Sequence, residues 1–176
     1  TVFGSSARLR CDIVFNNLVA SAYTSGTIEV KSDGTPRRPA IHVLDVCSAF
    51  AAGLEADAEL VDGRAFNVGM RDGNFAVREL ADTAGEVVPG SRVVFTGEHG
   101  GDLRTYTVGF SRILRELAGL YRPSWGLLAG GRDLCRLFDR VGFDGPTFRG
   151  STCNRLRRLE ELASVGRLDD DLRLVG

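Results

Sequence analysis

Short segments of strand-favouring residues alternate with longer segments whose apolar residues recur at helical spacing, and this alternation constrains the fold most strongly. The first helical segment runs from Leu9 to about Tyr23, and Gly26 follows where a C-terminal cap would lie. Strands that alternate with helices over short connections are typical of the α/β class. We therefore expect one α/β unit over residues 1–176, with no internal domain boundary.

A helix from Asp45 to about Ala56 is expected to bury Val46, Phe50 and Leu54, which lie on one helical face. Asn74 is expected to cap a helix that ends before Pro89. The other expected helices are residues 111–117, 133–141 and 153–165, and the expected strands are 1–3, 27–31, 38–43, 65–68 and 92–95.

Charge and hydropathy exclude several classes of protein. The chain has 22 Lys and Arg residues against 23 Asp and Glu residues, so no overall positive field favours nucleic acid or an anionic membrane. No segment approaches the roughly 18 consecutive apolar residues of a membrane helix, and no charged and then apolar leader opens the chain. These features predict a cytoplasmic protein that binds neither nucleic acid nor membrane.

The four cysteines, at positions 11, 47, 135 and 153, lie far apart without a CxxC pair or a nearby histidine pair. This spacing argues against a metal site and against a disulfide scaffold, and it favours reduced thiols. Lys31 is the single lysine, so all other basic residues are arginine. Arginine suits bidentate binding of phosphate or carboxylate, although a coding bias would give the same composition.

Four motifs occur in a fixed order, and each alone is weak. They are Asn16-Asn17, the segment 34–46 with sequence GTPRRPAIHVLDV, Phe66-Asn67-Val68-Gly69, and Asp102-Leu103-Arg104-Thr105-Tyr106. Together they resemble the C-terminal half of the NAD-dependent epimerase/dehydratase family, the extended short-chain dehydrogenase/reductases that act on nucleotide sugars. The resemblance extends to about Leu117.

The resemblance implies the C-terminal part of a Rossmann-type fold that lacks the N-terminal dinucleotide-binding strands. It implies a nucleotide-sugar substrate, NAD(P) as the cofactor of the full-length enzymes, and a homodimer in that form. It admits an epimerase, a dehydratase or a reductase, and hence an isomerase, a lyase or an oxidoreductase.

Two features of such enzymes would lie before Thr1: the glycine-rich dinucleotide turn and a Tyr-x-x-x-Lys pair. Four residues after its three tyrosines, the chain carries Thr27, Phe110 and Trp125. The stretches Gly97–Gly101 and Gly126–Gly131 lack the GxGxxG spacing between a strand and a helix, so we expect loops there. We therefore expect a truncated chain, inactive by itself, without catalytic residues.

The resemblance assigns substrate binding to three residues. Asn17 matches an amide that meets the diphosphate, Arg38 a phosphate-binding arginine, and Arg104 a second arginine near the nucleotide. Charged hydrogen bonds from such groups suit phosphate oxygens. The alternatives are an uncommitted polar residue for Asn17, a solvated charge for Arg38 and an ion pair with Asp102 for Arg104.

Other polar residues are expected to be structural. His42 is expected to be a hydrogen-bonded histidine in a buried strand, Asp45 a charge at a helix start, and Arg37 a surface residue. The chain departs from the family at Gly109 and Arg112, where an acid and a lysine are usual.

Two accounts of function follow. The first is the substrate-binding portion of a nucleotide-sugar epimerase or dehydratase. The second is a non-catalytic binding or interaction protein that reuses the fold and docks on a partner. In either case, unpaired sheet edges and bare apolar helix faces predict a marginally stable, association-prone chain.

Overall fold

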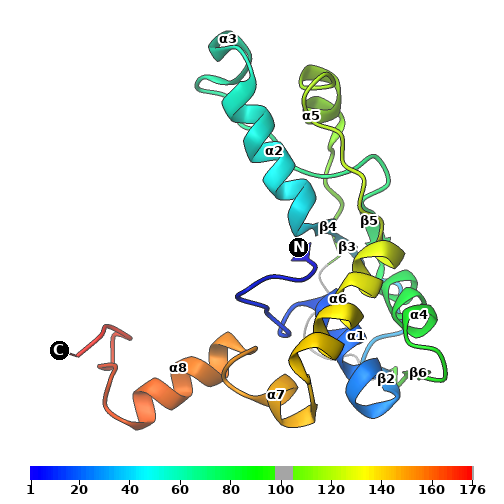
Figure 1. The fold of residues 1–176 in the computed structure, drawn as a ribbon, viewed down its shortest axis with the longest axis vertical. Helices are drawn as coiled ribbons and strands as arrows, with labels where there is room; N and C mark the ends of the chain where they lie inside the picture. Colours follow the sequence, from blue (N-terminus) through cyan, green and yellow to red (C-terminus); the bar gives the residue numbers. More distant parts are fainter. Residues whose placement is uncertain (98–104, 176) are drawn as a thin grey trace.

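A computed structural model of the chain describes residues 1–97 and 105–175. Within them, eight helices and six short strands form an α/β fold, which confirms the expected class (Figure 1). The strands are β1 (Val2–Phe3), β2 (Thr27–Val30), β3 (Arg37–Pro39), β4 (Ile41–His42), β5 (Asn74–Ala76) and β6 (Arg92–Phe95). The helices are α1 (Val14–Ser25), α2 (Val43–Glu55), α3 (Ala58–Val61), α4 (Val77–Val87), α5 (Ser111–Glu116), α6 (Leu127–Val141), α7 (Gly145–Arg149) and α8 (Arg155–Ser164).

The main core lies where α1, α4 and α6 pack together beside the parallel pair β2–β6 (Figure 1). Phe15, Leu80, Leu134 and Phe138 are fully buried there. Gly26 ends α1 in the left-handed conformation (φ 67°), as its position in the sequence predicts. This core supports the β1–β4 strand pair on one side and the pocket described below on another side.

A second parallel pair joins β1 to β4, with Val2 opposite Ile41. The chain leaves β1 through Gly4, whose φ is +111° and where a Cβ atom would lie 2.3 Å from His42 Nε2. Only glycine fits this close approach. β4 continues without a loop into α2.

Helix α2 forms an arm with α3 and α5, whose small core contains Ala49, Ala52 and Ile113 (Figure 1). Phe50 and Leu54, expected to be buried, are 70% and 88% exposed. The prediction was wrong because α2 carries apolar residues around most of its circumference, and the structure buries the face with the small alanines.

Two further expectations were wrong. Residues 65–68 form an irregular segment rather than a strand. Asn74 lies in β5, the antiparallel partner of β3, and does not cap α4. Its side chain instead exchanges two hydrogen bonds with the backbone of Val108, at 2.9 and 2.8 Å, and so holds residues 105–110 against β5.

Helix α6 begins at Leu127, so the loop expected at Gly126–Gly131 is helical from its second residue. A Cβ atom at Gly130 would lie 2.5 Å from the Phe3 ring, and one at Gly131 would lie 2.7 Å from Val87. Glycine is therefore required here by close helix packing rather than by a turn.

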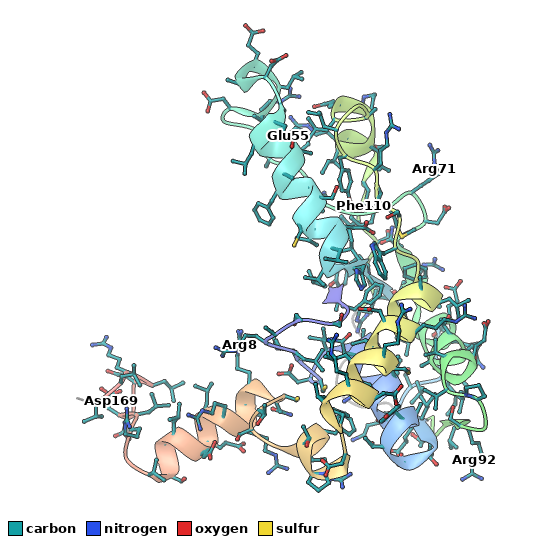
Figure 2. The ribbon with its side chains drawn as sticks, in the orientation of Figure 1. Arg8, Glu55, Arg71, Arg92, Phe110 and Asp169 are labelled. Carbon is teal, nitrogen blue, oxygen red and sulfur yellow. The ribbon has the colours of Figure 1, made fainter. Side chains whose placement is uncertain are left out.

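The C-terminal residues lead away from the body through α7 and α8 (Figure 1). In Figure 2, Asp169 marks the far end of this tail and Arg8 the loop that lies beside its beginning. Within the described ranges, no helix combines the length and the apolar character needed to cross a bilayer.

Candidate functional site

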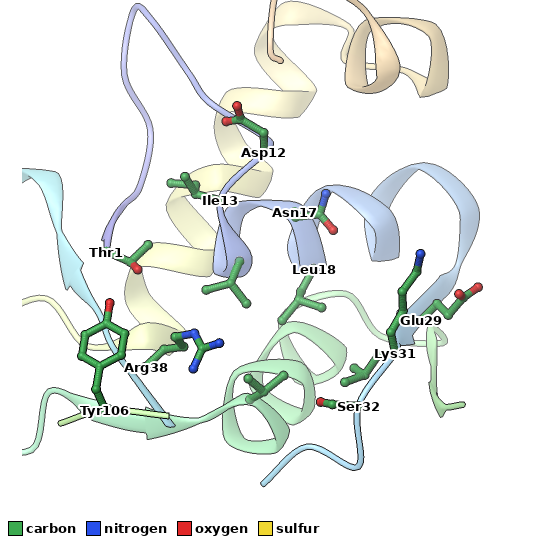
Figure 3. Close-up of a pocket in the computed structure, with 13 residues that line it drawn as sticks. Thr1, Asp12, Ile13, Asn17, Leu18, Glu29, Lys31, Ser32, Arg38 and Tyr106 are labelled. Carbon is green, nitrogen blue, oxygen red and sulfur yellow. The ribbon is translucent and has the colours of Figure 1, made fainter. Parts of the chain in front are cut away.

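A pocket of about 880 Å³ lies between the N-terminal part of α1, the end of β2, and β3 (Figure 3). Asn17 of α1 and Arg38 of β3 both line it. Two of the three residues that the resemblance assigns to substrate are thus brought to one cavity. Arg104, the third, lies outside the described residues.

Asn17 is half-buried, and its Nδ2 donates a hydrogen bond to the Cys11 carbonyl oxygen at 2.9 Å. A carboxamide has two N–H donors, and this bond uses one of them. Its neighbour Asn16 is buried and structural, because its Oδ1 accepts from the Gly4 amide and its Nδ2 donates to the Arg10 carbonyl. The two asparagines therefore have different surroundings.

Arg38 lies opposite Phe75 in the β3–β5 ladder. Its Nη1 donates to the Arg37 carbonyl oxygen at 2.9 Å, and its guanidinium carbon lies 5.8 Å from the centroid of the Tyr106 ring. This contact with an aromatic ring holds the planar cation at the pocket wall. Arg37 is exposed, as expected, and donates to the Asn74 carbonyl.

The pocket wall also carries Lys31, which the sequence-based site did not include. Lys31 follows β2, where Val30 is buried and Glu29 is exposed, so alternation places Glu29 and Lys31 on the outer face. Alternation alone does not place Lys31 at the pocket, because Val30, from the opposite face of the strand, also contributes to the lining. The lining thus contains two cations, Lys31 and Arg38.

Two carboxylates line the pocket as well, from Asp12 and Glu29. Arg10 Nε lies 2.8 Å from Asp12 Oδ1, and this hydrogen bond lowers the pKa of the Asp12 carboxyl. The charge of Asp12 is therefore balanced by Arg10, outside the lining. Glu29 is the second carboxylate of the lining, beside the cations Lys31 and Arg38.

His42 is buried, and its Nδ1 accepts a hydrogen bond from the Leu44 amide, which caps α2. Its ring stacks on Trp125 at a centroid distance of 4.2 Å. Burial lowers the pKa of His42, although Asp133 and Asp45 oppose the shift. His42 has the structural surroundings expected of it.

Asp45 is buried in the first turn of α2, and its carboxylate accepts the backbone amides of Ser124 and Trp125 at 2.9 and 3.1 Å. It therefore joins the start of α2 to the segment that enters α6. Its role extends beyond the helix-start charge that the sequence predicts.

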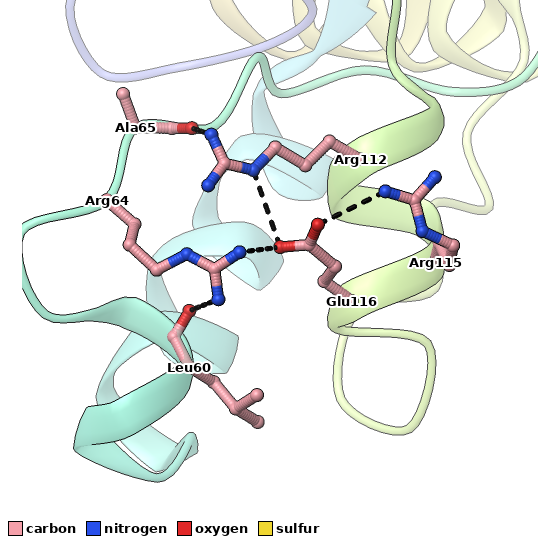
Figure 4. A network of polar contacts seen from close by, with 6 residues as sticks. All are labelled: Leu60, Arg64, Ala65, Arg112, Arg115 and Glu116. Carbon is pink, nitrogen blue, oxygen red and sulfur yellow. Dashed lines mark hydrogen bonds and ion pairs between the residues drawn. The ribbon is translucent and has the colours of Figure 1, made fainter.

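A polar network centred on Glu116 connects α5 to the segment that follows α3 (Figure 4). Arg64, Arg112 and Arg115 all pair with the Glu116 carboxylate, and Arg112 also donates to the Ala65 carbonyl. Partial burial would raise the pKa of Glu116, but Arg112 and Arg64 outweigh it and lower that pKa. Arg112, one of the departures from the family, is thus a structural residue.

Phe110 lies at the start of α5 (Figure 2). It packs over Gly69, where a Cβ atom would lie 2.3 Å from the Phe110 ring. Tyr121 donates to the Gly69 carbonyl at 3.1 Å, and burial, with Asp45, raises the pKa of Tyr121 to about 12. These contacts stabilise the arm and lie away from the pocket.

The chain has two glycine-rich stretches, Gly97–Gly101 and Gly126–Gly131. Gly126–Gly131 does not fit a dinucleotide cradle, because Gly130 and Gly131 are buried in helix packing and α6 does not follow a strand. Most of Gly97–Gly101 lies outside the described residues. Over residues 1–97 and 105–175, no group of three His, Cys, Asp or Glu side chains lies close enough together to hold a metal.

Residues 1–69 match the model of the NAD dependent epimerase/dehydratase family. A UDP-glucuronic acid 4-epimerase from Bacillus cereus, solved with UDP-glucuronic acid and NAD, is 19% identical with a TM-score of 0.64, over 80% of this chain and 43% of that one. A UDP-glucose 4-epimerase from Thermotoga maritima, solved with UDP-glucose, is 20% identical with a TM-score of 0.65, over 80% and 44%.

An NAD-dependent NDP-hexosamine 5,6-dehydratase of tunicamycin biosynthesis is 18% identical with a TM-score of 0.64, over 80% of this chain and 44% of that one. The chain therefore spans less than half of the length of these structures. Their likeness confirms the expected fold, part of the Rossmann-like extended short-chain dehydrogenase/reductase architecture. The match over residues 1–69 confirms the resemblance to the epimerase/dehydratase family.

Proposed function

We propose that the pocket between α1, β2 and β3 binds the diphosphate of a nucleotide sugar, and that the chain is the substrate-binding portion of an NAD-dependent epimerase/dehydratase. The observation that carries this proposal is that Asn17 and Arg38 line one pocket of about 880 Å³ although they come from different elements. A pocket of this size is within the range of small-molecule sites.

The donors in the pocket suit a diphosphate. Arg38 offers a planar fork of N–H groups, Lys31 a mobile ammonium, and Asn17 an amide donor. Phosphate oxygens accept charge-assisted bonds from such groups, and the guanidinium geometry favours bidentate contact. Arg104 is proposed as a second arginine at the nucleotide, because its motif position resembles that of the family.

Catalysis would require residues beyond those in the pocket. The 176 residues contain no Tyr-x-x-x-Lys pair, and Gly126–Gly131 does not fit a dinucleotide turn. We therefore propose that the chain binds nucleotide sugar without converting it, and that NAD(P), expected for the full-length family, is held mostly by residues other than these.

The second candidate function is a non-catalytic interaction protein. It is favoured by α2, whose Phe50 and Leu54 side chains are exposed although the helix is well formed. Such a protein would use α2 as its contact surface and would not need the pocket.

Calorimetric titration of the 176-residue chain with UDP-glucose, UDP-glucuronic acid and dTDP-glucose tests both candidates. Binding by the native chain and a loss of about tenfold or more in Arg38→Ala would support the first, since a hydrogen bond to a charged group contributes about 1.5–3 kcal/mol. Arg92→Ala is the matched control, because Arg92 is an exposed arginine on β6 outside the pocket lining (Figure 2). Equal losses in both variants, or no binding, would contradict the proposal.

A further inference from the structure

Cys11 and Cys153 are far apart in the sequence and adjacent in the structure. The Cys11 amide donates to the Cys153 carbonyl oxygen at 2.8 Å, and burial, followed by the neighbouring Cys153 thiol, raises the pKa of Cys11. Both residues are buried in the main core, at 2% and 5% exposure. Cys47 lies on α2 and is exposed, and Cys135 lies on α6 and is half-buried.

The backbone geometry suits a disulfide. With standard bond lengths, an amide nitrogen 2.8 Å from a carbonyl oxygen leaves the two Cα atoms at most about 6.7 Å apart. Disulfides bridge Cα atoms about 4.4–6.8 Å apart. Both residues also belong to the same buried cluster, so a bond between their sulfur atoms would form between side chains that share one environment.

The pair lies where the C-terminal tail meets the pocket wall. Next to Cys11, Asp12 Oδ2 accepts the backbone amide of Arg155 at 3.2 Å, which holds the start of α8. On the other side, the Cys11 carbonyl accepts the Asn17 amide. A covalent link at Cys11 would therefore join the tail to the segment that orients Asn17.

We propose that Cys11 and Cys153 form a reversible disulfide that fastens the C-terminal tail to the body. The oxidant class is a low-molecular-weight disulfide such as oxidised glutathione. One cysteine thiolate attacks a glutathione sulfur, forms a mixed disulfide and releases a glutathione thiolate. The second cysteine thiolate then attacks the protein sulfur and releases the other glutathione thiolate. Two electrons pass from the cysteines to glutathione, and the two cysteine protons end on the released thiols.

Burial raises the pKa of both thiols, and the nearby Asp12 carboxylate adds to the shift. The thiolate is the attacking species, so the bond forms slowly at neutral pH and faster as the pH rises. The closed bond restricts the unfolded chain between positions 11 and 153 and should raise the thermal stability.

Trypsin cleavage places the two cysteines on separate peptides, residues 11–31 and 150–155, so their linkage can be read by mass spectrometry. The reduced, folded chain is incubated with oxidised glutathione, alkylated and digested without reductant. The expected product is the linked pair of these two peptides, which dithiothreitol separates. A raised Tm in the oxidised chain, reversed by dithiothreitol, is expected together with it.

Cys153→Ser should abolish both the linked peptide and the Tm shift. The control variants Cys47→Ser and Cys135→Ser should keep both, because Cys11 and Cys153 are both present in each of them. The proposal is overturned when the native chain carries only glutathione adducts at Cys11 or Cys153, or when these cysteines link to Cys47 or Cys135 instead. The native-chain digest decides this even where Cys153→Ser fails to fold, and it does not depend on nucleotide-sugar binding.

Discussion

The Asn17 side-chain amide donates to the Cys11 backbone carbonyl across 2.9 Å, so a residue at the pocket is oriented by the segment that touches the tail. The irregular chain between β1 and α1 is thus part of the pocket's support. The orientation of the Asn17 carboxamide depends on that segment as well as on α1.

Asn17→Asp should weaken nucleotide-sugar binding by about tenfold or more. The substitution replaces an N–H donor with a carboxylate, which repels a diphosphate and leaves a charged hydrogen bond unmade. Calorimetry with UDP-glucose measures the change. Asn67→Asp is the matched control. It also removes a hydrogen bond from a side-chain amide to a backbone carbonyl, that of Gly109, but Asn67 lies outside the pocket lining. Equal weakening in both variants would assign the effect to stability.

Gly130→Ala should destabilise the chain, whereas Gly53→Ala should stabilise it by about 0.5–1 kcal/mol. Both glycines lie inside helices, where alanine is the better helix former. At Gly130 the new Cβ atom would lie 2.5 Å from the Phe3 ring, and such overpacking costs about 1–3 kcal/mol. At Gly53 it would meet nothing within 4 Å. Urea unfolding of the two variants measures the difference, and a shared sign would contradict the close packing.

Stability should fall as the pH drops below about 6.5, the ordinary pKa of histidine, because burial lowers the pKa of His42 in the folded chain. Below that pH the unfolded chain binds a proton that the folded chain does not, so the unfolding equilibrium constant grows by at most about tenfold per pH unit. Above it, this contribution is fully present. His42→Asn keeps a capping acceptor and should flatten the profile, measured by urea unfolding from pH 5 to 8. His99→Asn removes the other histidine and should leave the slope intact.

Phe50→Ser should reduce self-association of the purified chain. Phe50 is 70% exposed on α2, next to the equally apolar and 88% exposed Leu54, and contiguous apolar surface promotes association. Sedimentation velocity over a range of concentrations measures it. Ala51→Ser, an exposed position on the same helix, removes little apolar area and serves as the control. A native chain that stays monomeric at every concentration would contradict the prediction.

The sequence predicted the elements whose signals are local. The cap at Gly26, the strand Arg92–Phe95 and the helix beginning at Ser111 lie where the residue pattern placed them. The expected strand at residues 38–43 is divided at Ala40 between β3 and β4, because the two parts have different partners, β5 and β1. Partner choice of this kind is a tertiary property that alternation does not encode.

The candidate site was predictable in part. Asn17 and Arg38 were identified through an ordered series of motifs, and the structure brings them to one pocket. Lys31 was missed because its place at the pocket depends on how β2 packs beside α1. Gly130 was predicted to lie in a loop for a related reason. A glycine required by the close approach of an aromatic ring looks the same in the sequence as a glycine in a loop.

The paired hydrogen bonds between Asn74 and Val108 fix the position of the pocket rim. The Tyr106 ring lies beside the Arg38 guanidinium, and it belongs to the segment 105–110 that Asn74 holds against β5. Substitutions confined to the pocket lining would leave these two hydrogen bonds intact, whereas a change at Asn74 would alter the rim without changing any residue of the lining.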